Sequence, residues 1–172
     1  SGFEQHLKKS DFSVSKRTLA KYIEYLSEVF FIILSEKHAD SPRVRMMNPK
    51  KIYLIDTGFT LLSGATTENR GRLLENAAAI EFFRRGYTIR YFKGIRECDI
   101  ITFQHGKIYA AIQVCWEITR ENEKREFEGL IEAMESTWVK TGLIITYDRS
   151  EKIKYKGKSI KIISMWEWLL EK

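Results

Sequence analysis

The order of apolar patterns between residues 70 and 147 constrains the fold of this chain most strongly. Amphipathic spacing predicts helices, and short β-branched or apolar runs predict strands. His105-Gly106 predicts a tight turn between two of the strands, and Gly86 is a suitable helix C-cap. The predicted elements are, in order, a helix at 70–86, strands at 88–92, 98–104 and 107–116, a helix at 121–137 and a strand at 142–147. This order predicts an α/β (α+β) fold with a central mixed sheet.

The segments on either side of this core predict two further units. Residues 153–155 and 159–163 predict a hairpin, and 163–170 a short helix whose tryptophans, with Trp116 and Trp138, are expected to complete the core. Near the N-terminus, the spacing of apolar residues at 16–26 predicts an amphipathic helix capped by a serine. Residues 29–35 and 51–56 predict strands, separated by a polar turn at Pro42 and by 43–47. A helix followed by a basic hairpin is typical of the second half of a winged helix-turn-helix, so we expect a winged-helix-like unit at 1–60 and a second domain at 61–172.

The composition excludes several classes of protein. The longest apolar run, Val29 to Leu34, is too short to span a membrane, and no signal segment precedes it. Cys98 and Cys115 cannot form a disulfide framework, and no spacing of Cys and His matches a zinc site. We therefore expect a cytoplasmic protein without a membrane partner. Ser1-Gly2 without an initiator methionine indicates a fragment of a longer protein, and the net charge of +6 permits a nucleic-acid partner without requiring one.

Three polar residues fall on successive elements of the predicted core. Glu75 lies on its first helix, Asp99 opens its second strand, and Gln113 lies on its third. Restriction-endonuclease-like, or PD-(D/E)XK, nucleases use the same order of elements. They hold Mg²⁺ with hard oxygen ligands at these positions and use a lysine to polarise the attacking water. Here Cys115 occupies the lysine position. Glu75 and Asp99 are the candidate metal ligands, and Glu75, Asp99 and Gln113 the candidate catalytic set.

Each of these residues also has a purely structural interpretation. A helical glutamate such as Glu75 is usually a solvated charge, and Asp99 can cap a strand or lie at an edge. Gln113 in an apolar strand needs a hydrogen-bond partner whether or not a metal is present. Cys115 is a common small core residue.

The chain as a whole resembles the C-terminal region of a large group of prokaryotic AAA+-type P-loop ATPases. Lys51-Ile52-Tyr53-Leu54-Ile55-Asp56-Thr57-Gly58-Phe59 is similar to the signature that opens that region, and the later motifs match in order. These are Gly71-Arg72-Leu73-Leu74-Glu75-Asn76, Glu97-Cys98-Asp99-Ile100-Ile101, Ile112-Gln113-Val114-Cys115-Trp116, Gly142-Leu143-Ile144-Ile145-Thr146 and Met165-Trp166-Glu167-Trp168-Leu169-Leu170. The resemblance implies a winged helix and a restriction-endonuclease-like domain of uncertain role, following an ATPase domain. No P-loop motif occurs in this chain, so ATP binding is expected only in an upstream domain.

The resemblance also identifies a departure from the family pattern. Lysine usually follows Gln-Val in the third-strand motif, and Cys115 offers no positive charge there. Lys93 and Lys107 are the nearby lysines in sequence that could replace it.

Three functions follow from these observations. The first is a DNA-binding module of a larger ATPase with lost or impaired catalysis. The second is an active Mg²⁺-dependent endonuclease, and the third is a domain that docks on its own ATPase or on another protein. The residues expected to contact DNA lie on the first helix and the wing: Lys16, Arg17, Thr18, Lys21, Arg43, Arg45, Lys50 and Lys51. A solvated face of a helix and a hairpin is the alternative interpretation of these residues.

Overall fold

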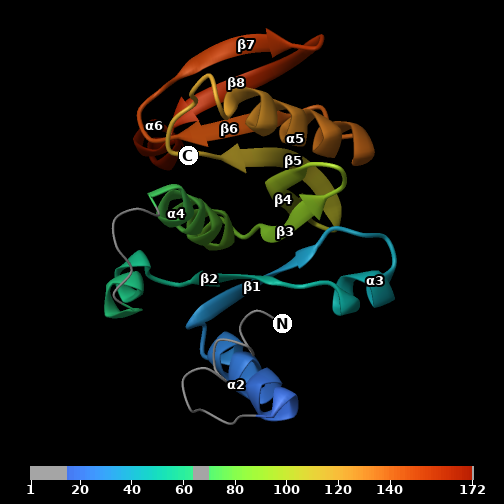
Figure 1. Cartoon of the computed structure of the whole chain (residues 1–172), viewed down its shortest axis with the longest axis vertical. Helices are drawn as coiled ribbons and strands as arrows, with labels where there is room; N and C mark the ends of the chain where they lie inside the picture. The colour runs from blue at the N-terminus through green and yellow to red at the C-terminus, as the bar shows by residue number, and fades with distance from the viewer. Residues whose placement is uncertain (1–14, 64–69, 172) are drawn as a thin grey trace.

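The computed structural model describes residues 15–63 and 70–171 (Figure 1). Within these ranges the chain forms helices and strands in the order that the apolar patterns predict for residues 70–170. The elements are α2 (Lys16–Glu28), β1 (Ile32–Lys37), α3 (Pro42–Met47), β2 (Lys51–Leu54), the 3₁₀ helix η1 (Thr57–Ser63), α4 (Arg70–Arg84), β3 (Thr88–Lys93), β4 (Glu97–Gln104), β5 (Lys107–Val114), α5 (Glu123–Ser136), β6 (Gly142–Thr146), β7 (Glu151–Tyr155), β8 (Lys158–Ser164) and α6 (Met165–Leu170).

The strands form one eight-stranded mixed sheet in the order β2-β1-β3-β4-β5-β6-β8-β7. Strands β3, β4 and β5 are antiparallel neighbours, whereas β5, β6 and β8 run parallel. The turn between β4 and β5 places both His105 and Gly106 at positive φ, as a tight hairpin turn requires. This arrangement confirms the predicted α/β class with a central mixed sheet.

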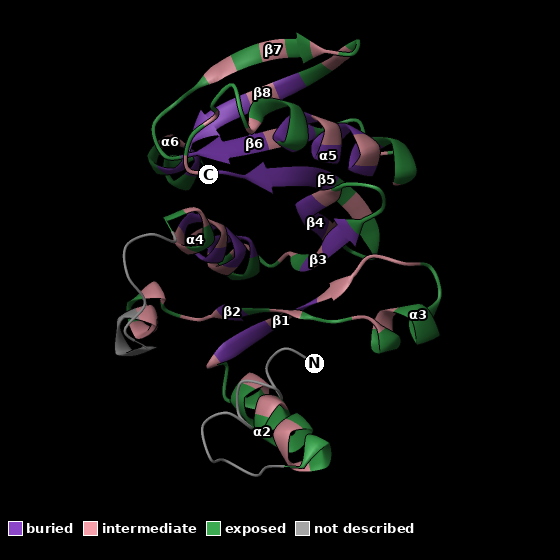
Figure 2. Ribbon diagram, in the orientation of Figure 1, coloured by how far each residue is buried: buried purple, intermediate pink, exposed green. Residues whose placement is uncertain are grey.

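Helices cover the sheet on both faces (Figure 1). One core cluster joins α4 and α6 to the sheet and includes Leu74, Phe82 and Trp168. The other core cluster joins α5 to the opposite face and includes Phe127 and Leu130. Most of β6 and the C-terminal parts of β5 and β8 are buried between these layers (Figure 2). The core of residues 70–170 is therefore a three-layer structure.

The N-terminal elements extend the same sheet. β1 and β2 pair antiparallel, as expected for a hairpin, and β1 also pairs in parallel with β3 at Glu36 and Lys37. Residues on both sides of the expected boundary at 60 thus contribute to one sheet. The segment between β1 and β2 is helical, because Pro42 favours the first turn of a helix and Ser41 adopts the extended conformation of an N-cap.

Helix α2 begins where the sequence predicts, since the Ser15 side chain accepts a hydrogen bond from the backbone N–H of Thr18 at 3.1 Å. None of its residues is buried, and Tyr22 and Leu26 are exposed (Figure 2). Within the described ranges, no helix is both long and apolar enough to cross a membrane.

The expectation that all four tryptophans complete the core is wrong for two of them. Trp168 is 4% exposed and packs against Phe82. In contrast, Trp166 is 58% exposed and Trp138 is 91% exposed. The difference within α6 arises because a short helix on the sheet buries only one side.

Candidate functional site

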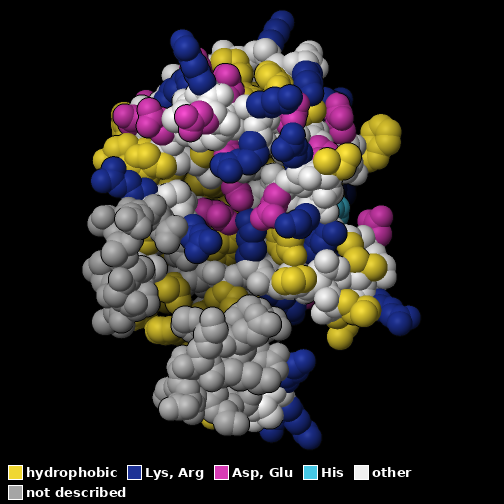
Figure 3. All heavy atoms as spheres, in the orientation of Figure 1, with side chains coloured by type: hydrophobic (Ala, Val, Ile, Leu, Met, Phe, Trp, Pro, Cys, Tyr) yellow, Lys and Arg dark blue, Asp and Glu magenta, His cyan; other side chains and the backbone are white. Residues whose placement is uncertain are grey.

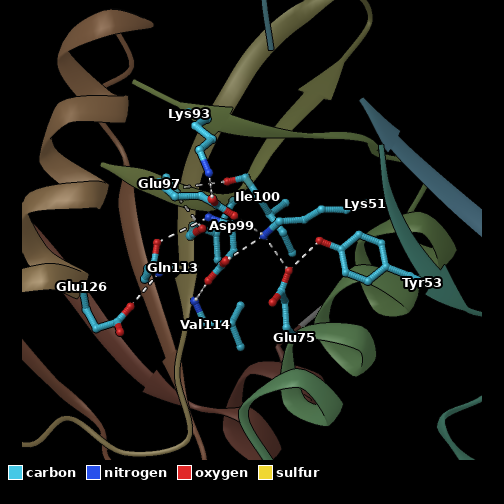
Figure 4. A network of polar contacts seen from close by, with 12 residues as sticks. Lys51, Tyr53, Glu75, Lys93, Glu97, Asp99, Ile100, Gln113, Val114 and Glu126 are labelled. Atoms are coloured by element: carbon cyan, nitrogen blue, oxygen red, sulfur yellow. Dashed lines mark hydrogen bonds and ion pairs between the residues drawn. The ribbon is translucent and has the colours of Figure 1, made fainter. Parts of the chain in front are cut away.

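Three carboxylates meet the ammonium group of Lys51, the first residue of β2. Its Nζ lies 2.9 Å from Glu75 Oε1 on α4, 3.0 Å from Asp99 Oδ1 on β4 and 3.1 Å from Glu97 Oε1 on the same strand. Figure 4 shows Lys51 reaching from β2 toward Glu75 and Asp99. The structure therefore brings two of the three predicted carboxyl or amide residues, Glu75 and Asp99, to one cation.

Strand β2 is held against helix α4 by polar side chains of the helix. The Asn76 amide accepts from the backbone N–H of Leu54 and donates to its carbonyl, both at 2.8 Å. The Tyr53 hydroxyl donates to Glu75 Oε1 at 2.8 Å. Asn76 thus binds the edge of β2 that does not pair with β1, much as a neighbouring strand would. Lys51 and Tyr53 are two residues apart, so their side chains lie on the same face of β2, which meets Glu75.

Asp99 is a nearly buried carboxylate with both oxygens engaged. Oδ2 accepts a hydrogen bond from the backbone N–H of Val114 at 3.1 Å, and Oδ1 contacts Lys51. Burial raises the pKa of Asp99 to about 6, with a further contribution from the negative charge of Glu75. The charge of Lys51 and the hydrogen bonds from Lys51 and the Val114 N–H lower the pKa of Asp99, but by less than burial and the charge of Glu75 together raise it. Asp99 is therefore ionised at neutral pH but holds a proton more tightly than an exposed aspartate.

The charges of the neighbouring groups fix the protonation of Lys51 and Tyr53. Burial alone would lower the pKa of Lys51, but the carboxylates of Asp99 and Glu75 outweigh it and raise the pKa above its usual value. Burial and the charge of Glu75 raise the pKa of the Tyr53 hydroxyl. At neutral pH the centre thus contains an ammonium group, ionised carboxylates and a neutral phenol.

Gln113 lies beside Asp99 but is bonded to the other helix. Its Nε2 donates to Glu126 Oε2 on α5 at 2.6 Å, and its Oε1 accepts from the Asp99 backbone N–H at 3.4 Å. Glu126 is 2% exposed, and the Arg125 guanidinium donates to its second oxygen. Of the predicted catalytic set, Gln113 is therefore the one turned toward α5 rather than toward Lys51 (Figure 4).

Cys115, in the position where the resemblance expects lysine, is a neutral core residue. It is buried in the cluster on the α5 side of the sheet. Burial raises the pKa of its thiol to about 12, and the charge of Glu126 adds to the effect. Of the other two lysines considered, Lys93 pairs with Glu97 Oε2 at 3.1 Å. Lys107 lies at the hairpin turn, at the opposite end of β4 and β5 from Asp99.

The position of Lys51 bears directly on metal binding. Within the part of the chain that the structure describes, no group of three or more His, Cys, Asp and Glu side chains is arranged to hold a metal ion. Glu75 and Asp99 converge on a single point, and the ammonium group lies there. Their oxygens are the ligands that Mg²⁺ prefers. A divalent cation can bind between them only if Lys51 moves away.

The residues expected to contact DNA lie in three different places. Four are on α2, two are on α3, one immediately precedes β2 and one is its first residue. Lys16 and Arg17 are exposed, whereas Arg45 donates to the Ala39 carbonyl at 2.8 Å, and Lys50 pairs with Glu36 at 3.0 Å. Lys51 belongs to the carboxylate cluster rather than to an exposed wing, because β2 lies against α4. The complete set is Lys16, Arg17, Thr18 and Lys21 on α2, Arg43 and Arg45 on α3, and Lys50 and Lys51 next to or on β2.

Several residues of the centre were not predicted from the sequence. They are Tyr53, Asn76, Glu97 and Glu126, together with the carboxylate-binding role of Lys51. One signal was available, since Lys51 and Tyr53 are two residues apart on a predicted strand and so share one face. The sequence contains no comparable signal for Glu126, whose helix carries many other charges.

Comparison with known proteins identifies archaeal and bacterial relatives. No family model matches the chain. It is 31% identical over 175 residues to the uncharacterized protein MJ1544 of Methanocaldococcus jannaschii, covering 95% of this chain and 38% of that protein. It is 26% identical over 159 residues to an uncharacterized protein of Haemophilus influenzae, covering 91% of this chain and 38% of that protein. The chain therefore spans about two fifths of the length of these curated relatives.

Proposed function

We propose that this chain is a nucleic-acid-binding module of a larger ATPase, with a nuclease-like centre whose catalysis is impaired because Lys51 occupies the place of the metal ion. The observation that carries the proposal is the contact of one ammonium group with Glu75, Glu97 and Asp99, all within 3.1 Å.

The order of the elements supports the nuclease-like part of the proposal. Helix α4, strands β3, β4 and β5, helix α5 and strand β6 follow the αβββαβ order of restriction-endonuclease-like domains. Glu75 and Asp99 lie on the first helix and second strand of that order and face a common point. Helix α2 with the β1–β2 hairpin supplies the helix and hairpin of the proposed winged-helix unit. The length of the two relatives leaves room for the proposed ATPase domain outside the matched segment.

The distribution of charge supports a nucleic-acid partner. The chain has a net charge of +6. Figure 3 shows acidic side chains gathered near the middle of one face, over α4 and the neighbouring strands, with Lys and Arg side chains around them. A phosphate backbone could contact these surrounding cations while one phosphate approaches the carboxylates through a bridging metal ion. The start of α2 carries further exposed basic residues.

Competition between Lys51 and a metal ion explains why catalysis is expected to be weak. The Lys51 ammonium group already neutralises Glu75 and Asp99. A metal ion must therefore displace the ammonium group, which then loses its contacts with both carboxylates. Cys115 supplies no positive charge to a developing hydroxide. Binding of Mg²⁺ or Mn²⁺ should therefore be weak and should improve when DNA supplies further oxygen ligands.

The test compares Lys51→Met with Lys93→Met in Mn²⁺ binding and DNA cleavage. Lys93 is the matched control, because it pairs with Glu97 at the edge of the cluster and is more exposed than Lys51. We expect Lys51→Met to bind Mn²⁺ at least tenfold more tightly than the wild type, measured by calorimetry and by the Mn²⁺-dependent rise in melting temperature. Lys93→Met should bind as the wild type does, and adding Asp99→Asn to Lys51→Met should abolish the gain. Equal Mn²⁺ affinity of Lys51→Met and the wild type would refute the competition.

The second candidate function is an active Mg²⁺-dependent nuclease, and the same lysine favours it. Once displaced by a metal ion, the Lys51 ammonium would remain close enough to stabilise a hydroxide or a phosphate, the role that Cys115 cannot perform. Cleavage by the wild type that disappears in both Lys51→Met and Asp99→Asn would establish this function in place of impaired catalysis. If neither duplex nor single-stranded DNA binds at low salt, the nucleic-acid function is refuted.

A further inference from the structure

An open groove of about 690 Å³ lies at the first part of helix α4, which also carries Glu75. Its walls come from η1, the first part of α4, the residues after β5 and β6, and α6. Leu73 and Leu74 form part of the α4 wall, and Trp116, Tyr147 and Trp166 supply aromatic rings. The volume falls within the range of about 300–1,000 Å³ that is usual for small-molecule sites.

Two aromatic rings of the groove are stacked on each other, and a cation lies over one of them. Trp116 and Tyr147 are stacked, with ring centroids 4.1 Å apart and planes inclined by 15°. The Arg70 guanidinium lies over the Trp116 ring, 5.3 Å from its centroid. Tyr147 and Trp166 are each more than half exposed. Exposed planar rings next to an arginine provide stacking and a phosphate contact, which are the interactions that bind unpaired bases.

Two elements of the fold carry residues of both the groove and the proposed phosphodiester centre. On α4, Leu74 lines the groove and the next residue, Glu75, contacts Lys51. On β5, the Val114 N–H binds Asp99, and Trp116 follows two residues later. Neighbouring residues of α4 and of the end of β5 thus contribute to the groove and to the centre that contains Lys51.

We infer that this groove binds unpaired bases of a single-stranded or locally opened nucleic acid, stacked on the Trp116–Tyr147 pair and against Trp166. This inference rests on the proposed function and names its substrate class. The bases of an intact duplex are already paired and stacked, so they cannot enter the groove. The chain should therefore bind single strands, or duplexes with frayed ends, more tightly than closed duplexes.

The experiment measures binding of a labelled thymidine oligonucleotide about twelve nucleotides long, and of the same strand annealed to its complement, in the presence of a chelator. We expect Tyr147→Ala and Trp166→Ala each to weaken binding of the single strand about tenfold, with duplex binding unchanged. Tyr147→Phe should keep the wild-type affinity, because stacking requires the ring and not the hydroxyl. Trp138→Ala is the matched control, since Trp138 is exposed at the end of α5 and does not line the groove. Melting curves establish that each variant is folded, as expected for positions that are half exposed.

The outcomes separate this inference from the proposed function. The inference is supported if the alanine variants of the groove lose single-strand binding while Trp138→Ala keeps it. If these variants bind the single strand as tightly as the wild type does, or if Trp138→Ala weakens binding equally, the inference is refuted while duplex binding stands. If the wild type binds neither form, both the inference and the nucleic-acid function are refuted.

Discussion

Replacing Asn76 with alanine tests whether one amide side chain attaches β2, and with it Lys51, to helix α4. The substitution removes two hydrogen bonds of 2.8 Å to the backbone of Leu54. A typical intramolecular hydrogen bond contributes about 0.5–1.5 kcal/mol, and an unsatisfied buried group costs about 1–3 kcal/mol. Leu54 is only partly buried, so water replaces part of what is lost. We therefore expect Asn76→Ala to lower the free energy of unfolding by about 2–4 kcal/mol.

Urea denaturation followed by circular dichroism measures this loss, and Asn122→Ala provides a matched control. Asn122 also makes two hydrogen bonds of 2.8 Å to the backbone, to the Thr119 N–H and the Glu117 carbonyl. These bonds are exposed, so the control should lose no more than about 1 kcal/mol. Equal losses in the two variants, or a loss below about 0.5 kcal/mol for Asn76→Ala, would show that strand pairing alone holds β2.

Three further predictions concern packing and pH. Trp168→Ala should lower the free energy of unfolding by about 3–5 kcal/mol, and Trp166→Ala should lower it much less, because Trp166 is exposed. Equal shifts of the melting temperature in the two variants would contradict this prediction. A Cβ at Gly129 would lie 2.2 Å from the carbonyl oxygen of the first residue of β4, whereas one at Gly71 meets no atom within 4 Å among residues 15–63 and 70–171. In paired denaturation curves, Gly129→Ala should therefore lower the free energy of unfolding by about 1–3 kcal/mol, whereas Gly71→Ala should leave it unchanged. The pKa of Asp99 is raised from 3.8 to about 6, so the folded state binds this proton more tightly than the unfolded state does. As pH falls from 6 to about 4, the wild type should gain stability relative to Asp99→Asn, and an opposite slope would show that the pKa is lowered.

The sequence by itself determined most of the elements between residues 70 and 170. The predicted and observed ends of α4, α5 and the strands differ by a few residues at most. The turns at His105-Gly106 and Lys156-Gly157 were predictable because glycine and a neighbour that tolerates positive φ occur where two strands must reverse. These features depend on side chains that are close in sequence, and such local interactions leave a periodic pattern that can be detected without a structure.

The short elements near the N-terminus were less predictable. Residues 42–47 form a single short helix, too brief to show a helical period. The apolar positions of α2 predicted a buried face, yet its residues remain partly or fully exposed. Amphipathic spacing indicates that a helix has one face that can be buried. Whether that face is buried depends on where the other elements of the structure lie.

Tertiary structure alone decided the composition of the carboxylate centre. The sequence predicted Glu75 and Asp99 as neighbours and placed Lys51 on an exposed wing, and the roles of all three stay predictions. The structure places Lys51 between carboxylates that are 24 and 48 residues away in the chain. That contact follows from the pairing of β2 with β1 and from the two hydrogen bonds that Asn76 makes to Leu54. Strand order and helix placement determine which distant charges meet, because the free energy of their contact depends on the whole sheet and no local pattern encodes it.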